Sequence, residues 1–229
     1  GTNPNTANPY TTGQTFNSNL TVTGIGRGSG ITGIDANDRY NASSWNTASI
    51  DLNAYFEFTL TPITGYEINF VSFVYTGQTS GTGPTSFAFR SSVDSYTTNI
   101  GTPSSSGVTI SLNTLAFQGI NSAITFRIYG WNASAAGGTF SINDFTFTGG
   151  ILGSATTAIS GFSTCLGSAS SAQSFVVNGQ GLSSATATIT VAGSANYEVS
   201  ITSATAGFAS SVSFNASGGA VSQTVWVRL

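Results

Sequence analysis

Short segments in which apolar and polar residues alternate are the feature of this sequence that most restricts its fold. In "YFEFTLTP", for example, Phe56, Phe58 and Leu60 occupy every second position. Side chains of a β-strand point alternately to its two faces, so this spacing predicts a strand with one buried face. Clusters of Gly, Pro, Asn and Ser separate such segments, which is typical of a β-sandwich. Further segments of this kind are "YEINFVSFVYTG", "TSFAFRSSV", "GVTISLNTLAF", "AITFRIYGW" and "GTFSINDFTFTG".

The composition of the chain changes near residue 150. After the linker "GGILGSATTAISG", aromatic residues become rarer and Ala, Ser, Thr and Val dominate. We predict an all-β protein with a jelly-roll β-sandwich over residues 1–150 and a smaller Ig-like β-sandwich over residues 151–229. An Ig-like sandwich has about seven strands, so the second domain is expected to lack its last strands. Its predicted strands lie in "AQSFVVNGQGL", "ATATITVAG", "NYEVSITSA", "SSVSFNAS" and "VSQTVWVRL".

The residue types that are missing exclude most catalytic chemistry. Charged residues make up 6% of the 229 residues, and the chain contains no Lys, no His and one Cys. A Ser-His-Asp or Cys-His arrangement, a Walker lysine and a cluster of zinc ligands are therefore all impossible within this chain. We predict that the protein is not an enzyme, and a glycosidase-like pair of carboxylates is the one catalytic alternative that remains.

The low charge also restricts partners and location. Five arginines cannot form the basic surface that nucleic-acid phosphates require. No apolar run is long enough to span a bilayer. Low charge without Lys or Met fits an extracellular protein, so we expect an extracellular or cell-surface location.

One loop has a composition that suits a hard cation. In "GIDANDRYN", Asp35, Asn37, Asp38 and Asn41 bring carboxylate and amide oxygens close together in the sequence. Such oxygens are the ligands of Ca²⁺, so a structural calcium ion is one hypothesis, although the spacing is not that of an EF-hand. The alternative is a turn in which the Asx side chains bind neighbouring backbone groups. No other cofactor is predicted.

Several aromatic residues are candidates for binding a sugar. Trp45, Tyr96, Tyr129 and Trp131 would form a platform for polysaccharide if they were exposed together. The alternative is that they belong to the core or its rim, where aromatic residues are more often found.

Arginines in aromatic strands are expected to have partners that fix the fold. Arg127 lies in "TFRIYGW", and Arg90 is four residues from Asp94. Because a buried or half-buried charge requires a partner, we interpret these arginines as members of structural pairs.

The last strand raises the possibility of strand exchange. If the second sandwich is incomplete, the edge at Val225, Val227 and Leu229 would carry unpaired backbone groups able to accept a strand from another molecule. The polar N-terminal arm, in which Pro4 and Pro9 disfavour internal pairing, is the candidate donor. Head-to-tail exchange of this kind produces a filament.

Two stretches resemble a known class of proteins. "SGTGPTSFAFRSSVDSY" and "ITFRIYGWNASAAGGTFSINDFTFTG" resemble a jelly-roll module of large secreted proteins of Bacteroidota. "STCLGSASSAQSFVVNGQGLSSATATITVAGSANYEVS" resembles the Ig-like repeats found beside that module. The resemblance implies a surface adhesin or a cargo of the type IX secretion system.

These observations lead to two functional hypotheses. The first is a non-enzymatic structural or adhesive module of an extracellular assembly, whose partners are other copies of itself or neighbouring domains of a larger surface protein. The alternative is a carbohydrate-binding module of a secreted polysaccharide-degrading protein.

Overall fold

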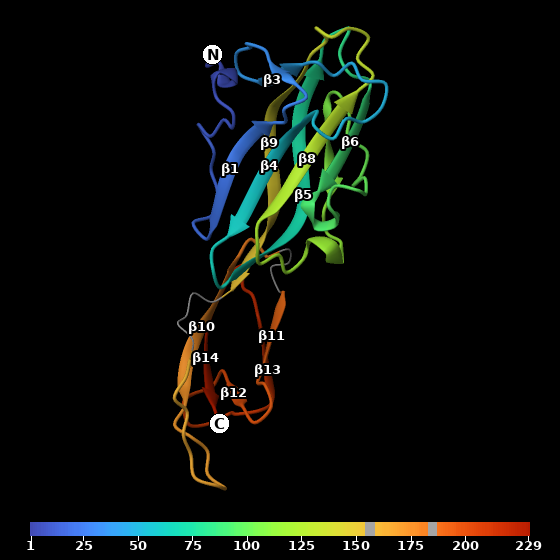
Figure 1. Ribbon diagram of the computed structural model, residues 1–229. Helices are drawn as coiled ribbons and strands as arrows, with labels where there is room; N and C mark the ends of the chain where they lie inside the picture. The colour runs from blue at the N-terminus through green and yellow to red at the C-terminus, as the bar shows by residue number, and fades with distance from the viewer. Residues whose placement is uncertain (154–158, 183–186) are drawn as a thin grey trace. The chain divides into compact units, whose positions relative to one another are not determined.

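A computed structural model describes residues 1–153, 159–182 and 187–229 and shows an all-β protein, as predicted (Figure 1). The chain divides into two compact units. The first unit comprises Gly1–Ile63 and Phe70–Thr148, and the second comprises Thr64–Asn69 and Gly149–Leu229. The predicted boundary at residue 150 lies beside this division, whereas nothing in the sequence indicated that residues 64–69 belong to the second unit.

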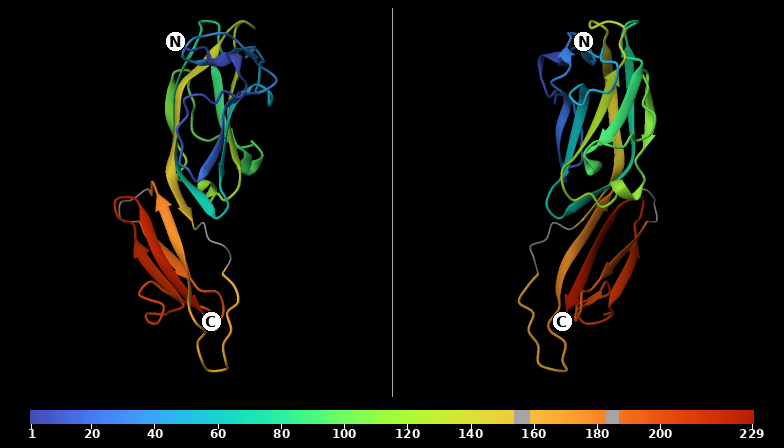
Figure 2. Two further views of the ribbon diagram at one scale, coloured as in Figure 1. Left: turned by 90° about the vertical axis from the view of Figure 1, so that its left-hand side faces the viewer. Right: turned by 45° about the vertical axis from the view of Figure 1, so that its right-hand side comes forward.

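The first unit is a sandwich of two antiparallel sheets (Figures 1 and 2). One sheet has the strand order β1-β4-β8-β6, and the other has the order β2-β3-β9-β5-β7. From β3 to β9 successive strands alternate between the two sheets, so most connections cross from one layer to the other. The strands are β1 (Leu20–Arg27), β2 (Thr32–Gly33), β3 (Tyr40–Ser43), β4 (Tyr55–Pro62), β5 (Tyr66–Thr79), β6 (Ser86–Ser91), β7 (Gly107–Ser111), β8 (Ile124–Trp131) and β9 (Phe140–Gly153). The 3-10 helices η1 (Pro4–Thr6), η2 (Ser92–Asp94) and η3 (Leu115–Phe117) lie in its connections.

Aromatic rings fill the space between these sheets. Burial alternates strictly along β4, where Phe56 is fully buried and its neighbours are half-buried, as the sequence pattern predicts. Phe73 of one sheet stacks on Phe89 of the other with ring centroids 4.8 Å apart, and Phe89 stacks on Phe126 at 5.4 Å. Such contacts add to the large hydrophobic contribution of each buried ring.

The second unit also contains two sheets, but its core is smaller (Figure 1). β10 (Gln173–Gln180) pairs with the end of β9 and with β14 (Val221–Arg228), which pairs in turn with β12 (Glu198–Ser200). β11 (Thr188–Ala192) and β13 (Ser211–Asn215) form the other sheet. All the strands predicted for this region are thus present, and the end of β9 adds another. The buried core residues are Val177, Ile189, Val199, Ala216 and Val225.

The last strand lies inside its sheet rather than at an edge. β14 pairs with β10 along its length, and Val227 also pairs with β12 on the other side. The Leu229 N–H donates to Ser170 Oγ (2.9 Å), and the Leu229 carbonyl accepts from the Ser170 N–H (3.0 Å). The prediction of an open edge is therefore wrong at Val227 and Leu229, and the side chain of Val225 is fully buried. Alternation within a strand does not reveal which strands flank it.

Within the described part of the chain, no helix has the length and hydrophobicity needed to cross a membrane.

Buried tyrosines make the stability of the first unit sensitive to alkaline pH. The Tyr75 hydroxyl donates to the Ser104 carbonyl (2.6 Å) and accepts from the Ser104 N–H (2.9 Å). Burial raises the pKa of Tyr75 to about 12 and that of Tyr40 to about 12, from the usual 10.0. A raised pKa means that the folded state keeps its proton while the unfolded state loses it. The stabilisation is therefore complete below pH 10 and decreases as the pH rises toward 12.

We predict that the midpoint of thermal unfolding falls between pH 10 and pH 12, and that it falls less steeply in the Tyr75→Phe variant. Circular dichroism at a series of pH values measures this difference. Parallel curves for the two proteins over this range would show that Tyr75 titrates normally in the folded state.

Candidate functional site

Charged and aromatic side chains gather on the outer face of the four-stranded sheet in the first unit. The strand register places Tyr55 opposite Tyr129, Glu57 opposite Arg127, and Arg127 opposite Arg90. These side chains occupy the positions that alternate with the buried residues of the same strands. We name this group the outer-face cluster, which consists of Tyr55 and Glu57 on β4, Arg90 on β6, Arg127 and Tyr129 on β8, and Tyr96 in the loop after η2.

Arg127 is the centre of the outer-face cluster. Its Nε donates to Glu57 Oε2 at 3.1 Å, and the side chains of Arg127 and Glu57 are 21% and 33% exposed. The guanidinium carbon lies 3.9 Å from the centroid of the Tyr55 ring and 4.0 Å from that of the Tyr96 ring. A guanidinium is attracted to the face of an aromatic ring, so the two tyrosines hold it in one orientation.

The loop that carries Tyr96 is held in an uncommon backbone conformation. Ser95 and Tyr96 have φ angles of 59° and 60°, in the left-handed region that non-glycine residues rarely adopt. Arg90 stabilises this conformation through hydrogen bonds from Nη1 to the Tyr96 carbonyl (3.0 Å) and from Nε to Asn99 Oδ1 (2.7 Å). Strained residues of this kind persist only where the surrounding structure fixes them.

The Asp94 carboxylate closes the same loop. It accepts hydrogen bonds from the backbone N–H groups of Thr97 (3.3 Å) and Thr98 (2.8 Å), and the hydrogen bonding at Thr98 is the main reason that the pKa of Asp94 lies below its usual value. The predicted pairing of Arg90 with Asp94 is not what the structure shows, because each binds other groups of the loop. The partner expected for Arg127 is present, because Arg127 forms an ion pair with Glu57.

Tyr129 lies beneath this loop, although its position in β8 faces outward. It is fully buried, its ring meets the edge of Tyr55 at a centroid distance of 5.6 Å, and Arg90 lies 5.8 Å from its ring centre. Burial raises the pKa of Tyr129. Its hydroxyl interacts with the Arg127 side chain, which opposes this rise in the pKa of Tyr129, although no hydrogen bond of good geometry reaches the hydroxyl among the described residues.

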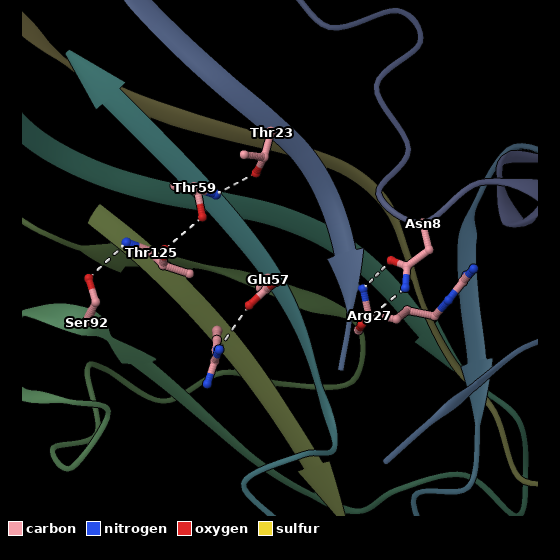
Figure 3. A network of polar contacts seen from close by, with 8 residues as sticks. Asn8, Thr23, Arg27, Glu57, Thr59, Ser92 and Thr125 are labelled. Carbon is pink, nitrogen blue, oxygen red and sulfur yellow. Dashed lines mark hydrogen bonds and ion pairs between the residues drawn. The ribbon is translucent and has the colours of Figure 1, made fainter. Parts of the chain in front are cut away.

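A row of hydroxyl groups continues the face beyond the outer-face cluster (Figure 3). The Thr59 and Thr125 hydroxyls are 2.7 Å apart across neighbouring strands. The Thr59 N–H donates to Thr23 Oγ1 (3.3 Å), and the Thr125 N–H donates to Ser92 Oγ (3.0 Å). These contacts connect β1, β4, β8 and η2 with neutral polar groups.

A second arginine fixes the N-terminal arm to the first unit. Arg27 donates from Nη1 to Asn5 Oδ1 (3.1 Å) and from Nη2 to the Asn5 carbonyl (3.1 Å), and it lies 4.2 Å from the centre of the Tyr40 ring. The Arg27 N–H donates to Asn8 Oδ1 (2.8 Å), and Asn8 Nδ2 donates to the Arg27 carbonyl (3.2 Å) (Figure 3). The arm that the sequence suggested as a strand donor is therefore bound within its own unit.

The predicted calcium loop is engaged by the same arm. The Thr2 N–H donates to Asp38 Oδ1 (3.1 Å), and the Asn41 N–H donates to Asn5 Oδ1 (2.6 Å). Among the described residues, no group of three or more His, Cys, Asp or Glu side chains is placed to hold a metal ion. The contacts of Asp38 and Asn41 are with the N-terminal arm and not within the loop, so they do not show the self-binding turn of the alternative. The calcium site at Asp35, Asn37, Asp38 and Asn41 stays a prediction.

The predicted sugar platform is not assembled. Trp45 is fully buried, with its Nε1 donating to the Ala42 carbonyl (2.8 Å), and it packs against core rings. Tyr129 is buried as described, whereas Tyr96 and Trp131 are half-buried. Placing Trp45 and Tyr129 on an open platform was wrong, because sequence alternation alone does not show which loops cover a strand.

Sequence reasoning did not single out Tyr55 and Glu57 as neighbours of Arg127. Tyr55 and Glu57 occupy the outward positions of "YFEFTLTP", and Arg127 and Tyr129 occupy those of "TFRIYGW". The outward positions in each strand could be predicted from the sequence, but the register that places these residues opposite each other could not.

Searches against protein-family models, curated proteins and solved structures found no match.

We predict that Asn5→Ala lowers the free energy of unfolding by about 2–3 kcal/mol, because the Asn5 amide binds Arg27, Asn41 and the carbonyls of Ala36 and Arg39. Chemical denaturation measures the change. The matched control is Asn121→Ala, at an exposed position, which is expected to change stability by less than about 0.5 kcal/mol. Equal effects of the two substitutions would show that the arm contributes nothing to the folded state.

Proposed function

We propose that this protein is a non-enzymatic structural and adhesive module of an extracellular or cell-surface assembly. The observation that carries the proposal is that its few charged side chains are used internally. Arg27, Arg90, Arg127 and Arg228 each bind other parts of the fold. General acids, bases and nucleophiles need groups that are free to face a substrate.

The carboxylates support the same proposal. Glu57 and Glu198 form ion pairs with arginines of neighbouring strands. Asp51 and Asp94 accept hydrogen bonds from backbone N–H groups of their own turns, and Asp144 accepts from Thr76 Oγ1 (3.3 Å). A glycosidase would require two carboxylates that face each other across a cleft. The carboxylates named here instead bind other groups of the fold.

The architecture supports a role as a spacer. Each unit has its own buried core, although β9 contributes strand pairs to both units. Modules of this kind act in series in surface proteins, because each unit folds around its own core and carries its own loops. The resemblance to modules of Bacteroidota surface proteins favours the same location.

Filament formation by exchange of the N-terminal arm is not part of this proposal. The arm would first have to release Arg27, Asn41 and the Tyr40 hydroxyl, which donates to Asn8 Oδ1 at 2.9 Å. Contacts with neighbouring domains or with a polysaccharide need no such release.

The single cysteine offers a direct test of location. Cys165 is exposed, and the chain has no Lys for amine reagents to label. After mild reduction, a membrane-impermeant maleimide is expected to label the protein on intact cells of its source, and Cys165→Ser is the control that must stay unlabelled. Labelling only after lysis would contradict the extracellular location.

A further inference from the structure

We propose that Arg127, flanked by Tyr55 and Tyr96, binds the carboxylate or sulfate groups of an acidic polysaccharide. This inference rests on the adhesive part of the proposed function and names its ligand class. It concerns the outer face of the four-stranded sheet in the first unit.

The local charge favours an anion. Arg90 and Arg127 are direct partners across β6 and β8, and like charges in that position repel each other. Glu57 is the one carboxylate that forms an ion pair with either arginine among the described residues. The Asp94 carboxylate is directed to the N–H groups of Thr97 and Thr98. The outer-face cluster therefore contains two arginines and one carboxylate, in a chain whose net charge is −3.

The donor groups suit an oxyanion. The Nε of Arg127 is occupied by Glu57, and the Arg127 side chain is 21% exposed. Because two tyrosine rings lie against the guanidinium, a ligand would meet it through its N–H edge. The planar fork of N–H donors matches the oxygen spacing of a carboxylate or a sulfate.

The site is also ordered in advance. Ser95 and Tyr96 adopt left-handed backbone angles in a loop that Arg90 holds, so the ring of Tyr96 is in place before any ligand arrives. Binding then requires little further ordering, which favours affinity. The Tyr129 hydroxyl, which is buried and interacts with the Arg127 side chain, is an additional polar group of this region.

The surroundings favour a sugar chain over an acidic peptide. Half-buried tyrosine rings combine an apolar face with a polar tip. The adjoining hydroxyl row of Thr23, Thr59 and Thr125 provides neutral donors and acceptors along the sheet. A polyhydroxylated chain with spaced anionic groups complements both features, whereas a polyanionic peptide would use only the charge.

The test compares polymers that share one backbone. Binding of the full chain to dextran sulfate, carboxymethyl dextran, unmodified dextran and poly-glutamate is measured by biolayer interferometry. We expect binding to one or both anionic dextrans, weakened by salt, and none to unmodified dextran. Binding to unmodified dextran with equal affinity, or to poly-glutamate as tightly as to the anionic dextrans, would overturn the proposal.

Variants locate the site. Arg127→Gln is expected to weaken binding about tenfold or more, because it removes charge-assisted hydrogen bonds. Glu57→Gln is expected to strengthen binding about threefold to tenfold, because it removes a nearby negative charge that competes for Arg127. A purely structural role of the ion pair predicts no such gain.

Two controls separate binding from folding. The double variant Glu57→Gln/Arg127→Gln leaves no unpaired carboxylate and is expected to lose binding while keeping its circular dichroism spectrum. Arg228→Gln is the matched control in the second unit, since Arg228 also pairs with a glutamate (2.7 Å) and lies over a ring, that of Phe208 (4.0 Å). It is expected to bind within about twofold of the parent protein, because that pair lies outside the outer-face cluster.

Unchanged binding in the folded double variant, or an equal loss in Arg228→Gln, would remove Arg127 from the site. No binding to either anionic dextran would also reject this inference. In that case, labelling of Cys165 on intact cells would still support the structural role, so the two proposals fail separately.

Discussion

The burial of aromatic rings between two antiparallel sheets is the constraint on which the first unit depends. Phe73 stacks on Phe89 across the sandwich, and Phe89 stacks on Phe126 of its own sheet. The free energy gained by removing such rings from water is the main stabilising contribution available to a chain with few charges. Because side chains alternate along a strand, a fixed inward set also fixes the outward set. The outer-face cluster around Arg127 is therefore a consequence of the same core.

Scarce charge gives each arginine a defined position. Arg27 joins the N-terminal arm to the sheet, Arg90 holds the loop of Tyr96, Arg127 joins β8 to β4, and Arg228 joins β14 to β12. Apart from Arg90, the main partners of these arginines are distant in sequence, and each guanidinium also lies over an aromatic ring. Arginines held in this way are compatible with the structural and adhesive role proposed above.

The positions of the strands could be predicted from the sequence, whereas the pairing between strands could not. Alternation correctly located β4 and the strands of the second unit, because burial on one face leaves a period of two. It did not reveal that β14 is flanked by β10 and β12, or that a loop covers Tyr129, because strand register and loop paths depend on contacts between distant residues. The binding of the N-terminal arm to the first unit could not be predicted either, because no pattern in the local sequence indicates the hydrogen bonds of Asn5.

Mechanical unfolding of single molecules tests most directly the claim that the protein is a structural module of two independently cored units. When the chain is extended from its two ends, we predict two separate unfolding events, with the larger gain in length from the first unit, which contains more residues. A single cooperative event, or gradual extension without a force peak, would contradict this claim.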